Sequence, residues 1–120
     1  MKEELRDLFD KAVKLRENGD LESAKNALLD LSQKDPNSAA ILCVLGDVCW
    51  DLELREEAIN YFGGAVGLSP KLEAASLGLF HCLWELGRRE DALNEVKRFQ
   101  TISDSENYQR IIQSINEQSD

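Results

Sequence analysis

Residues 42–70 read LCVLGDVCWDLELREEAINYFGGAVGLSP, in which two runs with helical spacing of apolar residues flank a polar turn. The offset from Trp50 in this stretch to Trp84 equals the offset from Pro36 to Pro70. This repeat period is about 34 residues, the length of one pair of antiparallel helices with its turns, and it predicts a helical solenoid. A solenoid offers an extended surface, so the period also favours a binding protein over an enzyme.

The same period extends through most of the chain. A shift by one period aligns Leu8 with Leu42, Ala24 with Ala58 and Ala92, and Leu28 with Phe62 and Val96. Small alanine side chains let paired helices approach closely. We predict an all-α fold in a single domain, residues 1–120. Three helix pairs are expected at about 5–38, 39–72 and 73–104, with a capping helix at about 105–117.

Turn and capping residues mark the ends of the predicted helices. Gly19 and Gly87 suit left-handed closing positions, and Asp20 and Ser38 are candidate N-caps. The first six helices are expected at about 3–17, 21–32, 39–52, 55–68, 72–86 and 89–102. Residues 103–106 have the capping-box spacing. The helix after them is amphipathic, with an apolar stripe of Tyr108, Ile111, Ile112 and Ile115.

Composition and charge restrict the classes of function. The 120 residues are 42% apolar, which suffices for a shared core, and their formal net charge is −9. This charge repels phosphate backbones and therefore predicts no nucleic acid partner. The acidity either only keeps the domain soluble or also selects a basic partner.

The cysteines and the apolar runs indicate the compartment. Cys43, Cys49 and Cys82 are an odd number without zinc-site spacing, and we expect reduced, mostly buried thiols. The first residues contain no apolar signal region. The longest apolar run, residues 39–45, is far shorter than the roughly 20 residues needed to cross a bilayer. These features predict a cytoplasmic protein without a membrane span.

The motif residues in this register resemble the tetratricopeptide repeat family. The matching residues in the second repeat are Leu45, Gly46, Ala58, Phe62, Ala65 and Pro70. Segments 19–24 and 87–92 also look like the family's turn into a second helix, and the resemblance covers roughly residues 5–104. It implies three repeats, a protein partner and no enzymatic activity.

Several residues depart from the family's pattern. Phe80 stands where the family prefers a small residue, so the third helix pair is expected to be spaced differently. Glu53 replaces the turn glycine, and a left-handed conformation there would cost about 1 kcal/mol or more, so we expect a different turn. Glycines inside the fourth helix weaken it and either are tolerated at an exposed site or form a smooth face for another chain. These glycines are Gly63, Gly64 and Gly67.

The resemblance implies that the first helix of each pair lines a concave groove. Steps of one repeat period then give four rows: Phe9, Cys43 and Leu77; Val13, Asp47 and His81; Arg16, Trp50 and Trp84; and Glu17, Asp51 and Glu85. Neighbouring helices lie about 8 to 10 Å apart, so one ligand can contact a whole row. The tryptophans would adjoin and either line the groove or pack between repeats. The acidic row is either a solvated face or a selector of partners.

Such a groove suits an amphipathic peptide with apolar anchors and Lys or Arg along one edge. Aromatic residues are frequent binding hot spots. Relatives that grip the carboxylate of chaperone tails use Lys, Asn and Arg in the groove. Here the matching positions hold Phe9, Val13, Val44, Ala74 and Gly78. The missing positive charges argue against acidic chaperone tails, whereas a helical or an extended ligand is compatible with the sequence.

Catalytic and cofactor sites have little support in the sequence. His81 and Asp47 are one repeat apart and could form a general base, but no positioned nucleophile accompanies them. No clustered Cys and His pattern supplies a metal site, and no glycine loop cradles a phosphate. We predict no enzyme, no cofactor and no metal. The expected role is a protein interaction module, with self-association through the groove or the glycine-bearing face as the alternative.

Overall fold

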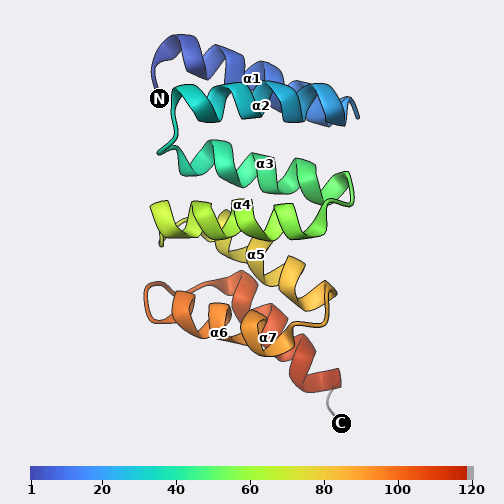
Figure 1. Ribbon diagram of the computed structural model, residues 1–120. Helices are drawn as coiled ribbons and strands as arrows, with labels where there is room; N and C mark the ends of the chain where they lie inside the picture. The colour runs from blue at the N-terminus through green and yellow to red at the C-terminus, as the bar shows by residue number, and fades with distance from the viewer. Residues whose placement is uncertain (119–120) are drawn as a thin grey trace.

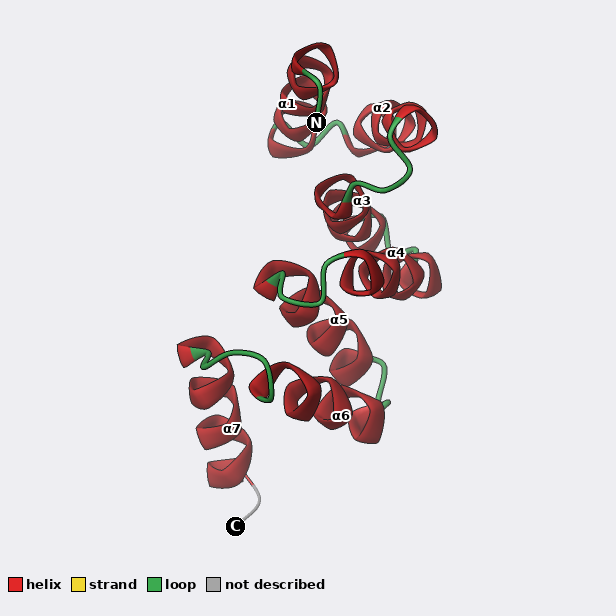
Figure 2. Cartoon of the chain, turned by 90° about the vertical axis from the view of Figure 1, so that its left-hand side faces the viewer, coloured by secondary structure: helices red, strands yellow, loops and turns green. Residues whose placement is uncertain are grey.

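The computed structural model describes residues 1–118 and contains seven α-helices in that range. Their bounds are Glu3–Glu17 for α1, Leu21–Lys34 for α2, Ala39–Asp51 for α3, Arg55–Leu68 for α4, Glu73–Glu85 for α5, Arg89–Gln100 for α6 and Glu106–Gln118 for α7. The helices stack in sequential order along a body of 49 × 27 × 20 Å (Figure 1). Figure 2 shows α1, α3, α5 and α7 along one side, with α2 and α4 along the other. The all-α solenoid is therefore confirmed.

The helix boundaries follow the local signals closely. α1 and α4 begin and end where the sequence predicts, and the other ends fall within two residues of the prediction. The Ser38 hydroxyl accepts a hydrogen bond from the Ile41 N–H at 3.3 Å and caps α3 as expected. Asp20 occupies the N-cap position of α2, but its side chain makes no capping hydrogen bond.

The cap of α7 differs from the predicted capping box. Ser105, rather than Ser103, accepts a hydrogen bond from the Tyr108 N–H at 3.1 Å. Ser105 also donates to a carboxylate oxygen of Glu73 in α5, so the cap joins two helices. The Ser103 hydroxyl instead points to the neighbouring Asp104 carbonyl. The capping-box rule considers only neighbouring residues of the sequence. It therefore could not include the hydrogen bond from Ser105 to Glu73 of α5.

The turn between α3 and α4 is built like the other two, which corrects the expectation for Glu53. Glu53 adopts a left-handed φ of 64°, beside 83° for Gly19 and 79° for Gly87. A left-handed conformation costs a residue with a Cβ roughly 1 to 2 kcal/mol. The backbone N–H of the following Leu54 still bonds to the Cys49 carbonyl at 2.8 Å. Repeat geometry therefore overrides the local preference of this residue.

Each helix pair contributes one section of the apolar core. Ala24, Ala58 and Ala92 are fully buried, as expected for close contacts between paired helices. Phe62 of α4 lies between the backbones of α3 and α5, because a Cβ added at Gly46 would lie 2.9 Å from its ring and one at Gly78 still closer. The absence of side chains at these two glycines makes the space for the ring.

The third pair fills the corresponding space in the opposite way. Phe80 replaces Gly46 in the register, and the smaller Val96 replaces Phe62. Phe80 is 2% exposed and stacks against Trp84 with ring centroids 5.8 Å apart. Its ring also meets the ring of Tyr108 edge-on at 5.9 Å. In the third pair the large side chain therefore belongs to the first helix rather than to the second. The space between the helices is filled in both pairs.

A buried polar network holds α7 against the third pair. The Ser76 hydroxyl donates to Glu95 at 2.5 Å and lies 2.6 Å from the Tyr108 hydroxyl. Because the single Ser76 proton goes to Glu95, Tyr108 donates to Ser76. Arg98 donates two hydrogen bonds to Glu95, at 2.7 and 2.6 Å, and a third to the Pro70 carbonyl at 3.0 Å. Every member has a partner, so the network orients α7 without an unpaired buried charge.

Candidate peptide-binding groove

The predicted inner rows of all three repeats contribute to one cavity of about 170 Å³, here called the first cavity. Its lining residues are Arg16, Asp47, Trp50, Asp51, Phe62, Gly78, His81 and Cys82. Five of these residues belong to the predicted set, and they come from α1, α3 and α5. The repeat step therefore places side chains from three different helices around a common space.

Three lining residues of the first cavity, Phe62, Gly78 and Cys82, are absent from the predicted set. Phe62 comes from α4, the second helix of its pair, whereas the predicted rows contain only residues of first helices. Its ring is 2% exposed and borders the cavity from the core, in the room that Gly46 and Gly78 leave. Glycines in first helices on both sides of an aromatic position are the signal that could have found it. Cys82 is 2% exposed and was assigned to the core.

A second cavity, of about 230 Å³, lies between α5 and α7. Its lining residues are Phe80, His81, Trp84, Glu85, Ile111, Ser114, Ile115 and Gln118. His81 lines both cavities, so the two are adjacent, and together they are called the groove from here on. The sequence predicts α7 as a cap but does not predict its contribution to this surface.

The remaining predicted residues lie outside both cavities. Phe9 packs partly buried against the core of the first pair, and Leu77 against that of the third. Val13 is half-buried, Glu17 is exposed, and Cys43 is 8% exposed in the core of the second pair. Phe9, Cys43 and Leu77 therefore each belong to or pack against a core cluster, and they line neither of the two cavities.

The two tryptophans occupy separate cavities and share one local arrangement. Each ring is half-buried and lies under the guanidinium of an arginine five residues later. The Arg55 carbon Cζ is 4.5 Å from the Trp50 ring centroid, and that of Arg89 is 4.6 Å from the Trp84 ring centroid. Trp84 additionally stacks on Phe80. Each indole therefore has an exposed portion, and Trp50 and Trp84 line neighbouring cavities in successive repeats.

The acidic row is partly compensated from within the chain. The Arg16 Nε donates to the Asp51 Oδ2 at 3.1 Å, and its Nη1 lies 4.0 Å from the Asp47 Oδ2. Burial raises the pKa of Asp47, Arg16 opposes that rise, and the Asp51 carboxylate adds to it. Glu17 and Glu85 are exposed. The Arg16 guanidinium therefore lies between Asp51 of the acidic row and Asp47 of the neighbouring row.

The geometry does not assemble the general base considered for His81. Among residues 1–118, the ion pairs of Asp47 include none with His81, whose ring instead meets Phe80 edge-on at 5.2 Å. All three cysteines are free and buried. Burial raises the pKa of Cys43 and of Cys82 to about 11, which keeps both thiols protonated at neutral pH. The cysteine of the first cavity is thus a poor nucleophile.

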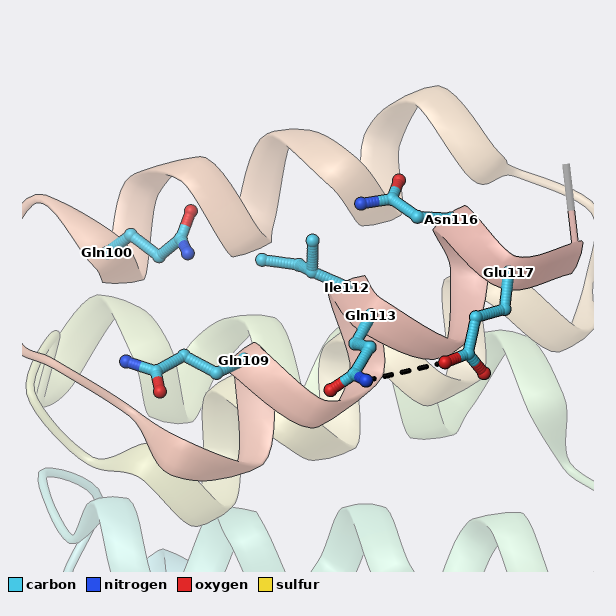
Figure 3. Close-up of a pocket in the computed structure, with 6 residues that line it drawn as sticks. All are labelled: Gln100, Gln109, Ile112, Gln113, Asn116 and Glu117. Atoms are coloured by element: carbon cyan, nitrogen blue, oxygen red, sulfur yellow. Dashed lines mark hydrogen bonds between the residues drawn. The ribbon is translucent and has the colours of Figure 1, made fainter.

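Two further cavities in the described part of the chain have different linings. One, of about 320 Å³, lies between α1 and α2 and contains no aromatic side chain; its lining is Leu8, Lys11, Ala12, Leu15, Ala27, Asp30, Leu31 and Lys34. The other, of about 510 Å³, lies between α6 and α7 (Figure 3). Its lining is Gln100, Gln109, Ile112, Gln113, Asn116 and Glu117, a mostly polar set that suits contact with water. Within residues 1–118, no group of His, Cys, Asp and Glu is placed to hold a metal ion. No helix in that range is both long and apolar enough to cross a membrane.

One protein-family model matches the chain, and several solved structures are similar to it. The family model described as tetratricopeptide repeat matches residues 50–113, just over half of the 120 residues. The chain is similar to the first TPR of Spaghetti (RPAP3) bound to the HSP90 peptide SRMEEVD, at 16% identity and a TM-score of 0.83. That match covers 94% of this chain and 90% of the other.

Two further solved structures have the same architecture. The Yersinia enterocolitica type III secretion chaperone SycD, in complex with a peptide of the translocator YopD, is 16% identical with a TM-score of 0.82. That match covers 98% of this chain and 90% of the other. MamA is 24% identical with a TM-score of 0.75, covering 86% of this chain and 56% of MamA. At such identities the likeness shows the fold alone. No curated protein matches the chain in sequence.

Proposed function

Because the chain belongs to the tetratricopeptide repeat family, we propose that it is a non-catalytic interaction module that receives a segment of a partner protein in the groove. The observation that carries this proposal is a pair of adjacent cavities that share His81 and contain one tryptophan each. Two of the similar proteins have peptides bound, one from HSP90 and one from YopD, which supports a peptide as the ligand. An adaptor, a scaffold or a small chaperone would use such a site.

The chemistry of the cavities defines the partner segment. An apolar cavity of about 150 Å³ holds benzene, so each cavity of the groove suits one large apolar side chain. The first cavity is floored by Phe62, and the second has Phe80, Ile111 and Ile115 in its lining. Asp47 and Asp51 at the first cavity favour a nearby Lys or Arg. We therefore propose a segment with two apolar anchors and a basic residue.

A selection of peptides tests this function. Random dodecapeptides displayed on phage are panned against the protein, and the affinities of the selected peptides are measured by calorimetry. Trp50→Ala and Trp84→Ala should each weaken binding at least tenfold, because buried aromatic hot spots commonly contribute about 2 kcal/mol or more. The double variant Trp50→Ala/Trp84→Ala should abolish binding, while circular dichroism shows that most of its helicity remains.

A matched control comes from the opposite helix layer. Gly67 of α4 has open space around its Cα, so Gly67→Arg adds a long side chain there without a steric clash. This variant should bind the selected peptides like the wild type. The acidic peptide SRMEEVD should bind weakly or not at all, because the matching groove positions lack Lys, Asn and Arg. Peptides that bind equally well to both tryptophan variants would contradict the proposed groove.

Self-association is the competing proposal. It would use the groove or the face of α4 that carries Gly63 and Gly67, both of which have open space where a Cβ would lie. Sedimentation over a wide concentration range separates the two proposals. A monomer at every concentration removes self-association, whereas a dimer disrupted by Gly67→Arg would place the interface on α4.

A further inference from the structure

Arg16 differs from the residues that occupy its register position in the other repeats. The second and third repeats have Trp50 and Trp84 there, whereas the first repeat has a guanidinium. That guanidinium turns toward the next repeat, with its Nε 3.1 Å from the Asp51 Oδ2. All three residues Arg16, Asp47 and Asp51 line the first cavity. The cavity therefore already contains a basic side chain, supplied by the chain itself.

The contacts of Arg16 are weak for an ion pair. Arg16 is 37% exposed, and Asp47 and Asp51 are each 38% exposed. Pairs with this exposure contribute little to stability, because water and salt screen them. One guanidinium also serves two carboxylates, and the Nη1 to Asp47 distance is long at 4.0 Å. Asp47 keeps a pKa raised by burial despite Arg16, so its carboxylate remains incompletely compensated.

The other ion pairs between repeats in residues 1–118 lie outside the groove. The Arg88 Nη2 lies 2.5 Å from the Glu56 Oε1, and the Lys25 Nζ lies 3.3 Å from the Glu57 Oε2. None of these four residues lines either cavity of the groove. A bridge that merely ties neighbouring repeats together is therefore available away from the groove. Arg16 is set apart because its bridge lies at the proposed binding surface.

We infer that the two carboxylates of the first cavity form a binding site for an Arg or Lys side chain of the partner segment, and that Arg16 occupies this site until the partner displaces it. The inference rests on the proposed function and specifies where the basic residue of the partner binds. A guanidinium from the partner can contact Asp47 and Asp51 in the fork geometry that favours arginine with carboxylates. Arg16 is then an internal competitor that lowers the affinity for basic partners.

Two blocked tripeptides test the inference directly. The probes are acetyl-Leu-Arg-Leu-amide and its citrulline counterpart, which has nearly the same shape without the charge. Affinities are measured from shifts of the backbone and indole N–H signals in nuclear magnetic resonance titrations. The variants are Arg16→Gln, Asp51→Asn and, as the matched control, Arg88→Gln, which removes an inter-repeat ion pair outside the groove.

The expected pattern distinguishes a competitor from a structural bridge. Arg16→Gln should bind the arginine probe about two- to fivefold more tightly than the wild type, in line with the strength of an exposed ion pair. The citrulline probe should show no such gain. Asp51→Asn should weaken binding of the arginine probe, and Arg88→Gln should leave it unchanged. All variants should unfold close to the wild-type temperature.

The contrary results are equally distinct. Equal or weaker binding of the arginine probe to Arg16→Gln would overturn the inference, as would equal affinities for the two probes. Absence of arginine-probe binding to every variant would also overturn it. If phage-selected peptides then still require Trp50, the proposed function survives without the basic subsite. Loss of that tryptophan dependence would instead reject the function itself.

Discussion

The second and third helix pairs solve one packing problem in opposite ways. In the second pair, Phe62 of the second helix fills space left by Gly46 and Gly78. In the third pair, Phe80 of the first helix supplies the bulk, and Val96 takes the place of the large ring. The solenoid therefore maintains the filled volume of each layer rather than the residue at each position.

The two pairs also differ in what covers their far side. The second pair is followed by another repeat, so its neighbouring layer is apolar. The third pair is followed by α7, which is held by the hydrogen bonds of Ser76, Glu95 and Tyr108 as well as by its isoleucines. Hydrogen bonds require more exact placement than apolar contacts, so this network fixes the orientation of α7 and with it the second cavity.

The largest difference in stability between the two pairs is expected for Phe62→Ala and the corresponding substitution in the third pair. The substitution leaves a cavity between two glycine backbones that have no side chains to refill it, so we expect a loss of about 3 to 5 kcal/mol of unfolding free energy. Val96→Ala at the corresponding position removes fewer atoms and should cost clearly less. Urea unfolding measures both variants. Equal losses would contradict the opposite distribution of bulk in the two pairs.

Alkaline pH should loosen the third pair and α7 through Tyr108. Burial, as the largest cause, raises the pKa of Tyr108 from the ordinary 10.0 to about 12, with the Ser76 hydrogen bond opposing and Glu95 adding to the rise. The fold therefore favours the protonated phenol, and its contribution is complete below pH 10 and disappears as the pH rises toward 12. At about 1.4 kcal/mol per pKa unit this amounts to roughly 3 kcal/mol.

Ultraviolet absorbance of the phenolate measures this titration, because the protein has two tyrosines. Tyr61→Phe isolates the signal of Tyr108, and Tyr108→Phe should remove the corresponding loss of stability between pH 10 and 12. A Tyr108 phenol that titrates near 10 in the folded protein would show that the hydroxyl is open to water and that the network is absent.

At neutral pH, Tyr108→Phe removes one hydrogen bond of the network while leaving the ring in place. The expected cost is about 1 kcal/mol of unfolding free energy, since Ser76 and Glu95 remain bonded to each other. Amide hydrogen exchange should accelerate in α7 more than in α3 or α4. Uniform acceleration along the chain would mean that the network supports the whole solenoid rather than the orientation of α7.

Exchanging glycine and glutamate at the turns of the second and third pairs is expected to change their stability in opposite directions. Glu53→Gly relieves a left-handed residue with a Cβ and should stabilise the second pair by about 1 kcal/mol. Gly87→Glu imposes the same strain on the third pair and should destabilise it by a similar amount. Thermal unfolding of the two variants checks the pair of predictions. A Glu53→Gly variant no more stable than the wild type would show that the glutamate stabilises this turn in another way.

The fold was largely predictable because its determinants are periodic. Helical spacing, turn glycines and the repeat period can all be read directly from the sequence, and together they located every helix in residues 1–118. Rules based on neighbouring residues gave the wrong turn and the wrong cap at two places, because residues far away in the sequence determine the structure there. Glu53 follows the geometry of its repeat, and Ser105 caps α7 with the help of Glu73 from another helix.

The groove was predictable only in part, for a related reason. The repeat step identified Arg16, Trp50 and His81, since side chains at equal positions lie on the same side of stacked helices. It could not include Phe62, a core residue whose ring borders the first cavity in the space that two glycines leave. It also left out the contribution of α7 to the second cavity, because the sequence analysis interpreted this helix only as a cap.

Binding of a partner segment in the groove is tested most directly by following the two indole N–H signals during titration with a phage-selected peptide. We expect the signals of Trp50 and Trp84 both to shift and to saturate at the same peptide concentration, together with backbone signals of Asp47 and His81. Shifts confined to the glycine-bearing face of α4, with both indole signals unmoved, would contradict binding in the groove.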